Sequence, residues 1–159
     1  MDEIKLNLGQ NEWRMEGWVN IDIDPSTNPD VIADAAHLPY ENDSVDEIYA
    51  GHLLEHFDIE QEVLREWHRV LEPGGKITIC VPDIEKSLSV WRNGNMLESF
   101  LNQVVYGAKN REAQNHHQIF TTEILKRQMV EYFKDVKEVT NCPYWVSNVV
   151  WQTTMEGTK

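Results

Sequence analysis

The chain has 159 residues, enough for one domain with a substantial core and too few for two. Its net charge of −13 argues against a nucleic-acid partner, because phosphate contacts need Lys and Arg. No apolar run approaches the ~20 residues of a membrane-spanning helix, and the two cysteines make neither a disulfide framework nor a metal cage. We therefore expect a single domain over residues 1–159 in the reducing cytoplasm, with no nucleic-acid and no membrane partner.

Short apolar segments followed by turns predict strands through the first half of the chain. The predicted strands cover residues 4–8, 19–23, 30–34, 45–50 and 76–81. The last of these is apolar at nearly every position, so we expect it to be buried on both faces of a sheet.

The clearest predicted helix covers Ile59–Leu71, whose apolar residues recur on one face. Asp58 is its expected N-cap, with Gln61 completing a capping box, and Pro73–Gly75 ends it. Further helices are expected at residues 84–91, 96–106 and 122–132, and two closing strands at 136–139 and 146–155.

This order predicts an α/β fold with a Rossmann-like, mostly parallel sheet and an antiparallel C-terminal edge strand. Little chain separates Gly9 from Asp22, and less separates Ile23 from the strand at 30–34. A crossover that contains a full helix needs about a dozen residues or more. The first two crossover helices are therefore expected to be shortened, which leaves one sheet face thinly covered. A homodimer that covers this face is one hypothesis.

The ends of the first two predicted strands carry the residues that point to a ligand. Gly9 follows the first strand and allows a close approach of backbone to ligand, because glycine has no Cβ. Asp22 lies at the end of the second strand, where a carboxylate can accept hydrogen bonds from ribose hydroxyls. The pair indicates a nucleoside-like ligand at the carboxyl end of the sheet.

With these motifs placed, the chain resembles the class I S-adenosylmethionine-dependent methyltransferases, in particular small type-11 members often associated with sugar and glycan metabolism. Six fragments match that family in order: Asn7–Gly9, Asn20–Asp24, Ala33–Tyr40, Ser44–His56, Arg69–Lys76 and His116–Thr121. The family usually has a second glycine soon after the first, whereas here Gln10 and Asn11 follow Gly9. Asn tolerates the left-handed conformation that such a turn needs.

The resemblance implies S-adenosylmethionine as cofactor and a set of residues that bind it. Asp22 would hold the ribose, Ile23 and Leu38 would enclose the adenine, and Asp34 with the Ala35 amide would meet the adenine edge. The complete set of predicted cofactor-binding residues is Asn7, Leu8, Gly9, Asp22, Ile23, Asp34, Ala35, Leu38 and Gly51.

Four histidines are the candidate catalytic residues: His52, His56, His116 and His117. An imidazole suits proton transfer from an acceptor because its pKa lies near neutrality. The stretch from His52 to His56 also matches the His-x-x-Glu-His pattern of a zinc hydrolase group. That pattern normally lies within a helix, whereas here it follows a strand, and spacing identifies no third ligand. We therefore expect no metal.

The leading interpretation is methyl transfer from S-adenosylmethionine to a small-molecule or glycan-type acceptor. The alternative is a non-catalytic, methyltransferase-like binding or assembly subunit. A nicotinamide-dependent oxidoreductase is disfavoured because the chain has no complete Gly-x-Gly-x-x-Gly motif.

Overall fold

The computed structural model describes residues 3–95, 97–107, 115–139 and 151–159, and in them the chain forms one seven-stranded sheet. The strand order is β3-β2-β1-β4-β5-β7-β6. The strands are β1 (Lys5–Leu8), β2 (Val19–Asp22), β3 (Val31–Ile32), β4 (Val45–Gly51), β5 (Leu71–Pro82), β6 (Lys134–Glu138) and β7 (Gln152–Thr158). The first five strands pair in parallel, and β7 runs antiparallel to β5 and to the edge strand β6. The predicted fold class is confirmed.

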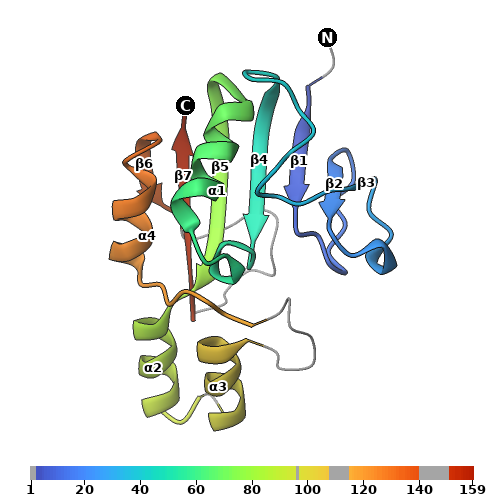
Figure 1. Cartoon of the computed structure of the whole chain (residues 1–159). Helices are drawn as coiled ribbons and strands as arrows, with labels where there is room; N and C mark the ends of the chain where they lie inside the picture. The colour runs from blue at the N-terminus through green and yellow to red at the C-terminus, as the bar shows by residue number, and fades with distance from the viewer. Residues whose placement is uncertain (1–2, 96, 108–114, 140–150) are drawn as a thin grey trace.

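The helices occupy two distinct places around this sheet (Figure 1). Helices α1 (Glu60–Val70) and α4 (Thr122–Met129) cover one face, whereas α2 (Ile84–Arg92) and α3 (Glu98–Tyr106) lie beyond the carboxyl ends of the parallel strands. None of the helices in the described part of the chain is long and apolar enough to cross a membrane. The carboxyl end of the sheet is therefore enclosed by α2, α3 and the segment that leads into α4.

Side chains alternate along each strand, so the two sheet faces differ in chemistry. The face under α1 carries fully buried apolar residues from adjacent strands, among them Leu6, Ile48 and Ile77, against which Trp67 of α1 packs. Burying a large apolar side chain contributes about 1.5–3 kcal/mol. The core thus lies between α1, α4 and this face.

The predicted cap of α1 is wrong. Ile59 stands at the N-cap position with no side-chain hydrogen bond. Asp58 instead accepts a hydrogen bond from His117 Nδ1 at 2.5 Å, and Gln61 donates to its neighbour Glu60. A contact from a distant segment therefore outcompetes the local cap. The last predicted strand begins within residues 140–150, outside the described residues, and β7 ends later than predicted, at Thr158.

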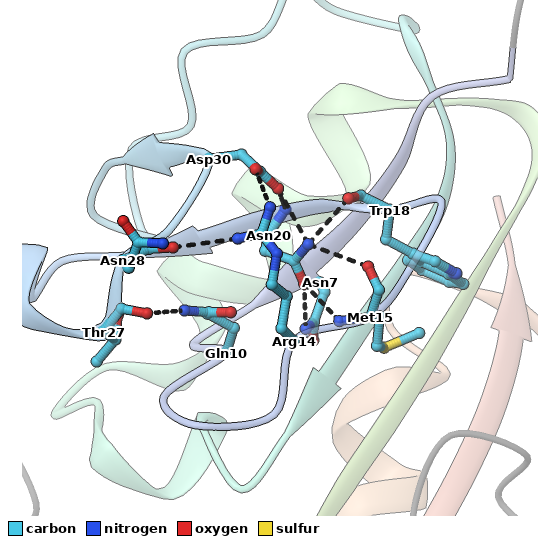
Figure 2. Close-up of polar contacts among 9 residues, drawn as sticks. All are labelled: Asn7, Gln10, Arg14, Met15, Trp18, Asn20, Thr27, Asn28 and Asp30. Atoms are coloured by element: carbon cyan, nitrogen blue, oxygen red, sulfur yellow. Dashed lines mark hydrogen bonds and ion pairs between the residues drawn. The ribbon is translucent and has the colours of Figure 1, made fainter.

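The first two crossovers are shortened, as predicted. No helix is assigned between β1 and β2, and only a 3₁₀ turn, η1 (Pro25–Thr27), lies between β2 and β3. Asn20 of β2 forms hydrogen bonds with both connections. Asn20 is 1% exposed, and its side-chain oxygen and nitrogen are both hydrogen-bonded. Its oxygen accepts from Asn7 Nδ2 (2.9 Å) and Met15 N (2.7 Å). Its nitrogen donates to the oxygens of Met15, Trp18 and Asp30, each at 3.0 Å (Figure 2).

Asp30 closes this network from the second crossover. Its carboxylate also accepts from the backbone N–H of Asn20 at 2.8 Å and pairs with Arg14. The Asn20 hydrogen bonds, aided by Arg14, lower the pKa of Asp30 to about 2, so the carboxylate is ionised throughout the physiological range. A polar network thus fastens the loops that replace two helices.

Asn20→Ala should lower the free energy of unfolding by at least about 2 kcal/mol, because each buried polar group left without its partner costs about 1–3 kcal/mol. Urea unfolding followed by circular dichroism measures the change. Asn95→Ala, at an exposed position, is the matched control and should change stability little. Equal stabilities for the two variants would contradict the structural role of Asn20.

Candidate active site at the carboxyl ends of the strands

Gly9 occupies a tight turn directly after β1. Its φ is +63°, and its backbone N–H donates to Ile21 O at 2.9 Å. A Cβ at this position would lie 2.7 Å from Leu53 Cδ1. The left-handed conformation and the close approach of Leu53 both favour glycine, so backbone, rather than a side chain, lies at the strand end.

Asp22 ends β2, and its carboxylate organises the loop around it. Oδ2 accepts from Asn11 N at 2.8 Å, and Oδ1 accepts from Asp24 N at 2.9 Å. Asn11 has φ +44°, so the expected left-handed asparagine in this turn is confirmed. Each carboxylate oxygen can accept a further hydrogen bond, and these are the positions available to ribose hydroxyls.

The predicted adenine-side residues divide into exposed and buried groups. Ile23 is 62% exposed beside Asp22 and offers an apolar surface, whereas Leu38 is 5% exposed and belongs to the core. Asp34 accepts from Ala36 N at 2.8 Å, and Ala35 O accepts from the Trp67 indole at 2.9 Å. Ile23 is therefore the accessible apolar contact, and the segment around Ala35 is held in place by α1.

The ends of β1 and β4 are shaped by three further residues of the predicted set, which belong to the strands themselves: Asn7, Leu8 and Gly51. The side chain of Leu8 is fully buried, and Asn7 Nδ2 donates to Trp13 O at 2.8 Å and to Asn20. A Cβ on Gly51 would lie 2.6 Å from the Tyr49 hydroxyl. These positions shape the backbone of the cradle.

A pocket of about 220 Å³ lies at the same edge of the sheet. Three of the four predicted catalytic histidines, His52, His56 and His116, line it together. His117 is directed to the surface, where it pairs with Asp58. The remaining lining residues are Asn11, Pro82, Phe100, Gln103, Val104 and Trp151.

The aromatic wall of this pocket was not predicted from the sequence. Trp151 stands between Phe100 and His52, with ring centroids 5.1 Å and 5.2 Å away. Phe100 belongs to α3 and Trp151 immediately precedes β7, so only the fold brings them together. Periodicity has no means of selecting these aromatic residues over the others in the chain.

Glu55 was also missed as a site residue. It lies in η2 (Leu54–His56), directly after β4, and is 1% exposed. Its Oε1 is 3.5 Å from His52 Nδ1 and 3.9 Å from His116 Nε2. The His-x-x-Glu-His pattern includes this glutamate, but only the structure shows that its side chain is buried beside His52.

Burial and charge set the protonation of this cluster. Burial raises the pKa of Glu55, but the neighbouring His52 outweighs it and makes the net shift downward. Burial lowers the pKa of His52, but contacts with Cys80 and Glu55 outweigh it and raise the pKa overall. Burial lowers the pKa of His116, against the opposing charge of Glu55. Glu55 and His52 therefore form an electrostatic pair at the pocket, in which each favours the charged form of the other.

The strand ends fit an adenosine-bearing sulfonium in three respects. The turn at Gly9 presents backbone without a side chain at the strand end, Asp22 keeps acceptor positions on both oxygens, and Ile23 is an exposed apolar side chain beside it. Asn11 connects this cradle with the histidine pocket, because its N–H binds Asp22 and its residue lines the pocket.

The comparisons with known proteins agree with this geometry. Residues 16–79 match a family model described as a methyltransferase domain. Over 49 residues the chain is 48% identical to "Methyltransferase GfsG" of Streptomyces halstedii, a stretch that makes up 31% of this chain and 18% of that protein. The chain thus spans less than a fifth of the length of this curated relative.

Solved methyltransferase structures share the fold. A possible histamine N-methyltransferase from Thermotoga maritima has a TM-score of 0.66 at 18% identity, with 100% of this chain and 83% of that chain covered. Phosphoethanolamine N-methyltransferase 2 of Haemonchus contortus, solved in complex with S-adenosyl-L-methionine, has a TM-score of 0.61 at 14% identity, with 100% and 49% covered.

These findings confirm the resemblance predicted from the sequence. The chain has the fold of the class I S-adenosylmethionine-dependent methyltransferases, and its residues 16–79 match a methyltransferase-domain model. Residues 16–79 therefore resemble a methyltransferase domain, and the described fold is the one found in S-adenosylmethionine-dependent methyltransferases.

Gly9→Ala should weaken binding of S-adenosylhomocysteine at least tenfold, because the added Cβ displaces Leu53 and the turn. Gly17→Ala is the matched control, since Gly17 has φ +79° and nothing within 4 Å of its Cβ position. Both substitutions carry a left-handed backbone cost of about 1–2 kcal/mol. Calorimetric titration of both folded variants isolates the contact, and equal affinities would contradict it.

Proposed function

We propose that the chain transfers a methyl group from S-adenosylmethionine to a small-molecule or glycan-type acceptor that lies in the histidine pocket. The observation that carries this proposal is the junction at Asn11. This residue binds the carboxylate of Asp22 and also lines the pocket with His52 and His56. A cofactor on the strand ends and an acceptor in the pocket would therefore be neighbours.

The proposed cofactor contacts come from strand ends that the sheet holds rigidly. The turn at Gly9 would receive the methionine part of the ligand, Asp22 would accept hydrogen bonds from the ribose, and Ile23 would contact the adenine. Asp34, Ala35 and the backbone after Gly51 complete the proposed set, with Asn7, Leu8 and Leu38 as support. When bound, the donor supplies an activated methyl group on a positively charged sulfur, so the protein needs no covalent nucleophile.

On the acceptor side the protein must hold the attacking atom about 3–3.5 Å from the methyl carbon. The aromatic rings of Phe100 and Trp151 suit the apolar face of a sugar or another ring. The Nδ1 atoms of His56 and His116 bond to backbone carbonyls, which leaves each Nε2 able to accept a hydrogen bond from an acceptor hydroxyl. General-base removal of the proton from such a hydroxyl typically increases the reaction rate by about 10²–10⁴-fold.

A non-catalytic binding or assembly subunit is the second candidate. Two features favour it: the Asp22 carboxylate already receives two backbone N–H groups of its own loops, and the crossover after β1 has no helix. A ligand-binding measurement together with a turnover measurement separates the two candidates.

Asp22→Ala should weaken S-adenosylhomocysteine binding by more than 1 kcal/mol, because a hydrogen bond to a charged group contributes about 1.5–3 kcal/mol. Asp24→Ala, which removes the cap of η1, controls for simple loosening of the loop. Incubation with a panel of sugar and polyol acceptors should release S-adenosylhomocysteine from the wild-type chain and little from Asp22→Ala.

Binding without turnover on any acceptor would favour the assembly subunit. An unchanged dissociation constant in a folded Asp22→Ala variant would remove this residue from the site.

We also infer a cytoplasmic location, which is supported by the buried free thiol of Cys80. In addition, we infer a homodimer that covers the sheet face opposite α1. Trp13 of the short first crossover is 52% exposed and is the aromatic side chain that such a contact could bury. Light scattering should give twice the monomer mass at micromolar concentration. A monomer would contradict the dimer, and secretion of a folded, disulfide-linked chain would contradict the location.

A further inference from the structure

Glu55 is a buried carboxylate whose hydrogen-bonding capacity is left unfilled by the described residues. Its side chain is 1% exposed, and neither carboxylate oxygen accepts a hydrogen bond from the residues that the structure describes. A buried carboxylate without hydrogen bonds carries a large desolvation cost unless a cation compensates for it. His52 is close, but its Nδ1 is 3.5 Å from Oε1, whereas a charge-assisted bond is about 2.7–2.9 Å long.

Two histidines lie near Glu55, and hydrogen bonds to backbone carbonyls fix the tautomer of each. His116 Nδ1 lies 2.8 Å from Val104 O, and His56 Nδ1 lies 2.9 Å from Asn115 O. A carbonyl oxygen only accepts, so both Nδ1 atoms carry the proton and both Nε2 atoms carry a lone pair. This second bond to a backbone carbonyl is the usual arrangement of a metal-ligating histidine.

One ligand atom from each of Glu55, His56 and His116 lies within 4.8 Å of the other two, and His116 Nε2 is 3.9 Å from Glu55 Oε1. Tetrahedral zinc with bonds of about 2.0–2.2 Å places its ligands roughly 3.4 Å apart, so small side-chain movements close the site. We propose that Glu55, His56 and His116 bind a divalent transition-metal ion, for which zinc is the best match.

The donor set and its surroundings agree with such an ion. Two imidazoles and one carboxylate suit zinc and exclude magnesium and calcium, which prefer oxygen ligands alone. Backbone contacts brace the site, because Glu55 O accepts from His117 N (2.8 Å) and Gln118 N (3.1 Å). The segment that carries His116 is thereby tied to η2, which carries the other two ligands.

His56 and His116 both line the pocket, so the ion has an open coordination position on that side, as catalytic zinc sites do. An oxygen of the pocket's occupant is the ligand that fits there. If the proposed methyl transfer holds, the acceptor hydroxyl coordinates the ion instead of donating a hydrogen bond to an imidazole Nε2, and this coordination makes the hydroxyl more acidic. Binding of the ion itself needs neither methyl donor nor acceptor.

The test is a calorimetric titration of chelator-stripped protein with Zn²⁺, with neither cofactor nor acceptor present. The wild-type chain should bind one ion, and its melting temperature should rise with zinc concentration. Glu55→Gln and His116→Gln should each lower the affinity at least 100-fold. His37→Gln is the control for incidental histidine binding, because its side chain is 85% exposed, and it should bind zinc as the wild type does.

His56→Gln serves as a further ligand variant at a half-buried position in case Glu55→Gln does not fold. Cobalt provides a second measurement: the wild-type complex should show the visible absorption of four-coordinate Co²⁺, and His56→Gln should lose it. Failure of the wild type to bind one zinc ion would overturn the proposal, as would equal zinc affinity in the wild type and the folded ligand variants. Neither result would bear on cofactor binding or methyl transfer.

Discussion

The hydrogen-bonded side chain of Asn20 is the constraint on which the first half of the sheet depends. In a parallel sheet, each crossover normally brings a helix that covers one face. Here the connections after β1 and β2 are too short for that, and Asn20 joins both of them through Asn7, Met15 and Asp30. A fully satisfied polar network thus performs the positioning that helix packing would otherwise supply. The turn at Gly9 and the carboxylate of Asp22 lie at the ends of the two strands that this network joins.

The second half of the chain contributes a different kind of surface. Helices α2 and α3 and the segment before α4 lie beyond the strand ends (Figure 1), where they close a pocket with Phe100, Trp151 and three histidines. The two halves meet at Asn11. The proposed cofactor site and the pocket with aromatic walls therefore share one edge of the sheet. A group transfer requires donor and acceptor to be neighbours in this way.

Glu55 connects the two proposals for this site. A carboxylate with 1% exposure and no hydrogen bond from the described residues needs a positive charge beside it. His52 supplies part of that charge at 3.5 Å, and a metal ion held with His56 and His116 would supply the rest. This reading gives the His-x-x-Glu-His stretch a role that differs from the zinc hydrolases, since the third ligand comes from a distant segment and the glutamate coordinates.

The alternating α/β order, the shortened crossovers and the strand ends at Gly9 and Asp22 follow from period and spacing, which are local properties of a chain. Three other features depend on packing: Asp58 binds His117 instead of capping α1, His116 lines the pocket while His117 does not, and Trp151 lies beside His52. These contacts join residues far apart in the chain. Their formation depends on how the helices and loops pack, which no local pattern encodes.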